Sequence, residues 1–296
     1  MDDDFFLTNL ELRESDASGG QASGLSHASM KGMLLLSVLE LAARGVPRGA
    51  LTVLHDAGDW GDRYREFAMR MAHEGWAIAL PDLRGHGRTE GTRGHSAGLQ
   101  EVCRDVQEIQ DHLAYRMPDS PKVLVGQGLG ALYAATFALE RPGMVSALVL
   151  LGPDAAPKFE LPAVPAGWKK LIGKKAMPED ASQIGWRGDQ LVASAEAAST
   201  WTQGEFAHGL ITRRAIEGAQ RAAQEYLPRI GAAGVPVLVL HGAEDGIAAS
   251  EGSRALAGDN VTVELLAGQR HHPLQDSSAE STTKRIASWL DEVLPR

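Results

Sequence analysis

A glycine-rich turn lies between a strand-like run and a helix-like run, and the spacing of its glycines matches two motifs found at functional sites. The run Lys122 to Val125 precedes it, and residues 126–131 read Gly-Gln-Gly-Leu-Gly-Ala. As G-x-G-x-x-A, the turn would bring a dinucleotide pyrophosphate to a helix N-terminus. As G-x-S-x-G, it would be the turn that carries a hydrolase nucleophile, with Gly128 in place of the serine. The motif alone does not decide between them.

The place of this turn in the chain disfavours a dinucleotide. Such a site belongs to the first βα turn of its domain and has an acidic residue about twenty positions further on. Here at least two strand-like runs precede the turn, and the nearest match, Asp154, comes late. We therefore expect no cofactor. We also expect no metal, and the single cysteine, Cys103, excludes a cysteine-based metal centre.

Several further stretches match the motifs of one known family, and together they are far more specific than any one of them. They are Leu-His-Asp-Ala-Gly at 54–58, Gly-Asp-Arg-Tyr at 61–64, Pro-Asp-Leu-Arg-Gly-His-Gly-Arg at 81–88, Leu-His-Gly-Ala-Glu-Asp at 240–245, and Gly-Gln-Arg-His at 268–271 with Asp276. Through these motifs, residues 30–294 resemble a monoacylglycerol lipase-type α/β-hydrolase. The resemblance implies a fold, a site and an ester substrate.

A catalytic triad is the first thing that the resemblance implies. By position, Gly128 is the nucleophile position without its serine, Asp245 is the acid and His271 is the base. In such a triad the acid orients the imidazole, which takes the nucleophile's proton. His272 is adjacent, but the spacing of the motif favours His271.

The resemblance also implies an oxyanion hole made of two backbone N–H groups, those of Ala57 and Leu129. Asp56 stands where the family usually has glycine. A carboxylate beside a developing oxyanion would oppose the charge stabilisation on which acyl transfer depends. The sequence leaves the direction of this side chain open.

Gly128 has no side chain with which to attack an ester, so no acyl-enzyme can form there. In a serine protease, loss of the nucleophile lowers turnover about a millionfold. Three accounts remain. The chain is a pseudo-hydrolase that binds a hydrophobic acyl ligand, or a serine-to-glycine variant of an active esterase or lipase. Alternatively, His271 with Asp245 activates water and hydrolyses esters without a covalent intermediate.

The elements that must position these residues are continuous apolar runs separated by helix-period stretches. Continuous runs of aliphatic residues are typical of strands buried on both faces, as in a parallel sheet covered by helices. The strand-like runs are residues 33–39, 51–54, 77–80, 123–125, 147–151, 237–240 and 261–266. We expect an α/β-hydrolase fold with a mostly parallel sheet of seven or eight strands, flanked by helices.

The alternation of strands and helices breaks at residues 153–234, a proline-punctuated stretch too long for a βα loop. We expect an inserted helical cap there, on a core of residues 30–152 and 235–296, after a flexible or peripheral segment at 1–29. The ligand is expected to be a small acyl ester or lipid-like molecule, because the cap is rich in large apolar residues. The substrate-binding candidates are Phe159, Trp168, Trp186, Trp201 and Leu210.

Composition excludes several classes of protein and partner. The 296 residues carry a formal net charge of −9 without a basic stripe, so nucleic acid is not an expected partner. The longest apolar run is too short to span a bilayer, and the acidic N-terminus is unlike a signal peptide. One cysteine fits a reducing compartment, so we expect a cytoplasmic location. The oligomeric state stays open.

Overall fold

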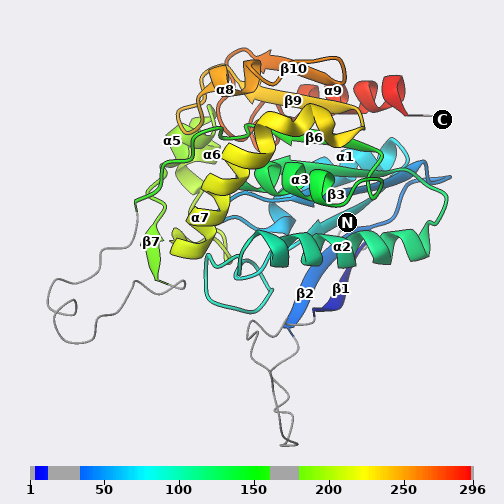
Figure 1. The fold of residues 1–296 in the computed structure, drawn as a ribbon, viewed down its shortest axis with the longest axis horizontal. Helices are drawn as coiled ribbons and strands as arrows, with labels where there is room; N and C mark the ends of the chain where they lie inside the picture. Colours follow the sequence, from blue (N-terminus) through cyan, green and yellow to red (C-terminus); the bar gives the residue numbers. More distant parts are fainter. Residues whose placement is uncertain (1–3, 13–33, 161–179, 295–296) are drawn as a thin grey trace, which may run out of the picture.

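An eight-stranded sheet lies at the centre of the computed structural model, which describes residues 4–12, 34–160 and 180–294 (Figure 1). Its order is β1-β2-β4-β3-β5-β6-β9-β10. The strands are β1 (Phe5–Leu12), β2 (Leu34–Leu41), β3 (Gly49–Leu54), β4 (Trp76–Pro81), β5 (Lys122–Gln127), β6 (Ala147–Leu151), β9 (Val237–Gly242) and β10 (Val261–Leu266). Only β2 pairs antiparallel, with β1 and β4, and all other neighbours are parallel. The expectation of a mostly parallel sheet of seven or eight strands is confirmed.

Helices cover both faces of the sheet, which is why its strands are apolar throughout. One face carries α2 (Leu99–Arg116), α3 (Leu129–Glu140) and α7 (Arg213–Arg221), continued by η2 (Ala222–Tyr226) and η3 (Leu227–Ala233). The other face carries α1 (Arg65–His73) and α9 (Ala279–Val293) (Figure 1). Alternate residues of one strand enter the two layers: in β6, Leu148 packs under α3 and Val149 packs on the opposite side.

The strand order brings distant parts of the chain together at one edge of the sheet. β3 lies beside β5, and β6 lies between β5 and β9, all of them parallel. Parallel strands end at the same edge, where α/β proteins bind their ligands. The residues that follow β3, β5, β9 and β10 therefore meet there.

The N-terminal segment differs from expectation at residues 5–12. The abundance of Ser, Gly and Asp in residues 1–29 suggests no firm structure, yet Phe5–Leu12 forms β1, paired along its length with β2. The pairing satisfies the backbone groups that face β2, and Leu10 and Leu12 pack into a small apolar cluster with β2 and α2. This segment is the peripheral edge strand of the sheet.

The predicted cap, residues 153–234, contains two kinds of structure among its described residues. Its middle part holds β7 (Ala181–Gln183), α5 (Gly188–Leu191), α6 (Ala195–Thr200) and β8 (Leu210–Thr212), with β7 and β8 forming a separate two-stranded sheet. Its last part, α7 to η3, packs directly on α3. Among the described residues, no helix is both long and apolar enough to cross a membrane.

Candidate active site at the edge of the sheet

Gly128 forms the sharp turn between β5 and α3. Its φ is 53° and its ψ is −111°, a conformation that side chains strongly disfavour. The flanking glycines allow the close approach of strand and helix, because a Cβ on Gly126 or Gly130 would lie closer than 3.0 Å to backbone atoms of neighbouring segments. The chain thus has the backbone of a nucleophile turn in an α/β-hydrolase.

Asp245 and His271 come from the loops after β9 and β10 and form a buried pair. Asp245 Oδ2 lies 2.7 Å from His271 Nδ1 and 3.1 Å from His241 Nε2. Its Oδ1 accepts hydrogen bonds from the N–H groups of Ile247 and Ala248. The structure therefore brings the predicted acid and base together, with the carboxylate held from both of its oxygens.

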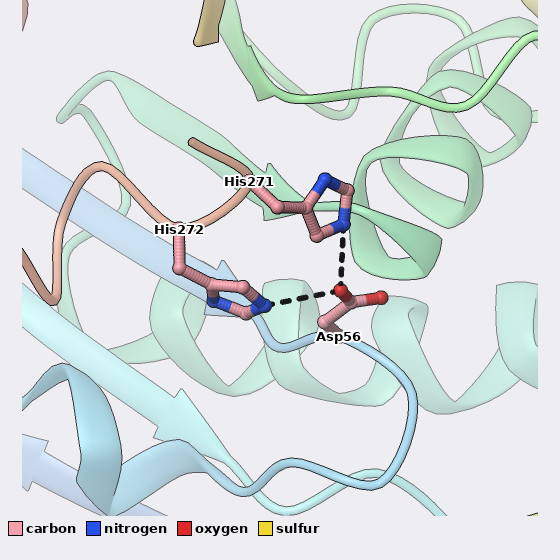
Figure 2. A group of neighbouring side chains, drawn as sticks. All are labelled: Asp56, His271 and His272. Carbon is pink, nitrogen blue, oxygen red and sulfur yellow. Dashed lines mark hydrogen bonds and ion pairs between the residues drawn. The ribbon is translucent and has the colours of Figure 1, made fainter. Parts of the chain in front are cut away.

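Asp56, in the loop that follows β3, points into the site, and both of its carboxylate oxygens make contacts there. Its Oδ1 accepts hydrogen bonds from Ala57 N at 2.7 Å and Leu129 N at 2.8 Å, the two N–H groups predicted for an oxyanion hole. Its Oδ2 lies 3.0 Å from His271 Nε2 and 3.2 Å from His272 Nε2, and Figure 2 shows both contacts meeting at one oxygen.

The Asp56 carboxylate occupies the space above Gly128. A Cβ built on Gly128 would lie closer than 3.0 Å to Asp56 Cγ and both carboxylate oxygens, a separation that real Cβ atoms essentially never show. A side chain at position 128 and the present position of Asp56 exclude each other. The two departures from the family pattern are thus sterically matched.

The electrostatics of the site are those of an imidazolium between two carboxylates. Burial alone lowers the pKa of His271, but the charge of Asp245 and hydrogen bonds to Asp245 and Asp56 outweigh it and raise the pKa to about 10. Burial raises the pKa of Asp56, but hydrogen bonds from His271 and His272, with their charges, hold it well below its usual range. His271 consequently carries both protons at neutral pH.

Two of the family motifs, residues 61–64 and 81–88, stabilise loops through hydrogen bonds and supply no reacting group. Asp82 accepts hydrogen bonds from Gly61 N at 2.8 Å and Arg88 N at 2.8 Å, and Arg84 makes two hydrogen bonds to Asp105. These contacts fix the loops after β3 and β4, so the loop that carries Asp56 has a defined path.

The predicted cap is joined to the site by the histidine loop and by an arginine. His272 N donates a hydrogen bond to Leu191 O at 2.8 Å, and Asp276 accepts one from Ser194 N at 3.0 Å. The Arg63 guanidinium lies between the rings of Trp60 and Trp201, 4.2 and 4.1 Å from their centroids. The tryptophan-bearing segment is therefore held over the site.

Three of the five predicted ligand-contacting residues surround the site, and one does not. The ring centroids of Trp186 and His271 lie 5.7 Å apart in an edge-on arrangement, and those of Trp201 and His272 lie 4.6 Å apart. Phe159 packs on Trp186. Leu210 is half-buried in β8, where it pairs with Gln183, and does not line the cavities described below. Trp168 lies outside the described residues.

Among the cavities that adjoin the site between the core and the predicted cap, two are lined by predicted ligand-contacting residues. The larger, with a volume of ≈ 210 Å³, is lined by Ala57, Arg63, Ile184, Trp186, Leu191 and Trp201, among others. The smaller, of ≈ 10 Å³, contacts Asp56, Gly128, Phe159 and His271 directly. The larger cavity combines apolar and aromatic side chains with a few polar ones, Arg63, Thr202 and His208, as small-molecule sites commonly do.

Sequence reasoning missed His272 and the direction of Asp56. The resemblance selects one histidine of the pair, but both contact the Asp56 carboxylate. The sequence gives one sign of the role of Asp56: both departures from the family motifs, Asp56 and Gly128, lie in the same predicted site, one in the oxyanion-hole loop and one at the nucleophile position. Among the described residues, Asp56, His271 and His272 are also the group whose atoms lie close enough together to hold a metal ion.

The sheet order, the helices on both faces and the turn after β5 define an α/β-hydrolase fold. A sequence profile for the family "Serine aminopeptidase, S33" matches residues 45–278, and the chain belongs to this family. Within this family, the chain is similar to monoacylglycerol lipases.

Two sequence relatives carry that name. The monoacylglycerol lipase of Mycolicibacterium smegmatis is 27% identical over 253 residues, covering 82% of this chain and 88% of the relative. The human monoglyceride lipase is 26% identical over 268 residues, covering 84% of each chain.

Solved structures agree on the fold. The Paleococcus ferrophilus monoacylglycerol lipase superposes with a TM-score of 0.70 at 22% identity, over 88% of this chain and 99% of the other. A soluble variant of the Saccharomyces cerevisiae monoglyceride lipase, in complex with a substrate analogue, gives 0.75 at 14% identity, over 94% and 98%.

Proposed function

We propose that this protein is a pseudo-hydrolase of the monoacylglycerol lipase type, which binds a lipid-like acyl ester and forms no acyl-enzyme. The observation that carries the proposal is the position of the Asp56 carboxylate. It accepts both N–H groups that would bind an oxyanion and fills the space where a nucleophile on residue 128 would stand. The site therefore offers a substrate carbonyl no nucleophile at residue 128, and no pair of N–H groups that could bind its oxygen.

The match between Asp56 and Gly128 also bears on whether the glycine is an isolated change in an active esterase or lipase. In that case the rest of the site would fit a serine, and a Gly128→Ser reversion would suffice. The carboxylate instead stands where the serine Cβ would go. The geometry favours a site in which both residues changed together.

Water activation by His271 is disfavoured by the same carboxylate. A general base needs a neutral imidazole with its Nε2 facing the water. Here Nε2 is bound to Asp56, and the pKa of His271 is raised to about 10 by Asp245 and Asp56 against the effect of burial. An imidazole that already holds a proton on Nε2 cannot accept one from water, so His271 cannot act as the general base at neutral pH.

The cavity beside the site supports an apolar ligand. Trp186, Trp201, Ile184 and Leu191 contribute apolar side chains to the wall of the larger cavity. The Asp56 carboxylate lines the smaller cavity, and its oxygens are already hydrogen-bonded. By family, the ligand class is a carboxylic ester with an acyl chain, and the relatives' names point to monoacylglycerols. We place this ligand between the core, residues 30–152 and 235–296, and the cap, residues 153–234.

The test separates binding from turnover. Purified protein is incubated in chelator with medium- and long-chain monoacylglycerols and with p-nitrophenyl esters. Binding is followed by tryptophan fluorescence, and free fatty acid or nitrophenol reports hydrolysis. We expect saturable binding and no turnover above that of His271→Gln, which keeps a hydrogen-bonding side chain. Turnover that is lost in His271→Gln would overturn the proposal, and so would the absence of binding to any of the esters.

A further inference from the structure

The cluster of Asp56, His271 and His272 has a composition that an ester hydrolase of this family does not need. A triad uses one histidine, but here two imidazoles from one loop point at the same carboxylate oxygen, as Figure 2 shows. Two histidines and one carboxylate are a ligand set that proteins use for zinc and for ferrous iron. All three side chains are at most 2% exposed.

The spacing of the three donor atoms fits a single ion. Oδ2 of Asp56 lies 3.0 Å from His271 Nε2 and 3.2 Å from His272 Nε2, and the three atoms lie within 4.8 Å of one another. Bonds of about 2.0–2.1 Å in tetrahedral geometry put neighbouring ligand atoms about 3.3 Å apart. Small side-chain adjustments would therefore bring all three donors to coordination distance.

Each donor is also held from its far side, as metal ligands generally are. Asp245 Oδ2 lies 2.7 Å from His271 Nδ1, and Gln275 Oε1 lies 3.3 Å from His272 Nδ1. The second oxygen of Asp56 accepts hydrogen bonds from two backbone N–H groups. These partners direct both Nε2 atoms and one carboxylate oxygen inward to a common point.

We propose that Asp56, His271 and His272 bind one divalent transition-metal ion, with Zn²⁺ as the reference ion, through Oδ2 and the two Nε2 atoms. Mg²⁺ and Ca²⁺ are disfavoured because they require mainly oxygen ligands. Three protein ligands leave one position of a tetrahedral ion for water or for a polar group of a ligand in the adjoining cavity.

Metal and proton compete for the same atom. A histidine must be neutral at the coordinating nitrogen, so binding releases the proton that His271 Nε2 shares with Asp56.

The experiment uses the full chain without a polyhistidine tag, stripped with a chelator and exchanged into metal-free buffer. ZnCl₂ is titrated by calorimetry, and Co²⁺ binding is followed by visible absorption, which reports the coordination geometry. The informative variant is His272→Gln, because its amide can still hydrogen-bond Asp56 but offers no imidazole. The matched control is His73→Ala, since His73 lies exposed on α1.

We expect one Zn²⁺ per chain in the wild type and the His73→Ala control. His272→Gln should lower the affinity at least about 100-fold, since a direct ligand is lost and loss of an outer partner alone costs about 10–100-fold. Asp56→Asn is a second variant, with the same expected direction. A folded wild type that binds neither ion at millimolar concentration, or equal affinity in His272→Gln and wild type, would overturn the proposal.

Discussion

Replacing Gly128 by serine is expected to destabilise this protein rather than to restore a hydrolase, because the Asp56 carboxylate fills the space that the new Cβ needs. The perturbation is a set of three variants: Gly128→Ser, Asp56→Gly and the double variant. Their folding free energies form a cycle that measures whether the two positions share one space.

The magnitudes follow from the contacts. A side chain at φ 53° and ψ −111° costs about 1–3 kcal/mol of backbone strain. Gly128→Ser must also push the carboxylate away from His271, and breaking a buried ion pair costs about 3–5 kcal/mol. Asp56→Gly loses the ion pair with His271 but introduces no backbone strain. The double variant loses that ion pair only once. Its loss of unfolding free energy should therefore be about 3 kcal/mol smaller than the sum of the losses in the two single variants.

The assay is equilibrium unfolding in guanidinium chloride for the wild type and the three variants, with equal denaturant slopes as the check on two-state behaviour. A fluorophosphonate probe, analysed by intact mass, gives a second reading: we expect labelling of the double variant and none of Gly128→Ser alone. Effects that add to within about 0.5 kcal/mol would refute the shared space. Labelling of Gly128→Ser as fast as the double variant would refute it as well.

Three further predictions concern pH, the cap and the ligand. The pKa of His271 is raised from 6.5 to about 10 against burial, chiefly by Asp245, so its stabilisation is complete below pH 6.5 and lost as pH rises through about 10. Unfolding free energies of wild type and His271→Gln should converge over that range, and a constant difference would contradict the assignment. Arg63→Ala removes the cation between Trp60 and Trp201 and its ion pair with Asp59, and should lower the unfolding free energy by at least about 1–2 kcal/mol. Arg70→Ala, at a half-buried arginine on α1, should have a smaller effect, and equal effects would contradict the role of Arg63. Trp186→Ala should weaken monoacylglycerol binding at least about tenfold in fluorescence titrations and Trp186→Phe much less, and unchanged affinity in the alanine variant would remove Trp186 from the cavity wall that contacts ligand.

The sheet was predictable because its strands are buried on both faces and so read as continuous apolar runs. Residues 147–151 are an example, since their side chains enter both core layers. β1 was not predictable in this way. Its residues alternate imperfectly, lie at an edge, and are set in a polar segment, so only pairing with β2 makes it a strand.

The Asp245–His271 pair was predictable from motifs because each residue lies in the loop that follows a strand, β9 for Asp245 and β10 for His271. The role of Asp56 was not. Its direction depends on donors from three loops, Ala57 N, Leu129 N and the two histidines, and none of them is near it in sequence except Ala57. Nor does a motif that names one histidine say where the neighbouring ring points.

Equilibrium dialysis of the metal-free protein against a long-chain monoacylglycerol, with mass spectrometry of the lipid on both sides, shows directly whether the site binds an ester without cleaving it. Since the Asp56 carboxylate occupies the two N–H groups that acyl transfer would need, we expect the ester to accumulate with the protein and to be recovered intact. Conversion to free fatty acid and glycerol, at a rate that falls in His271→Gln, would contradict it.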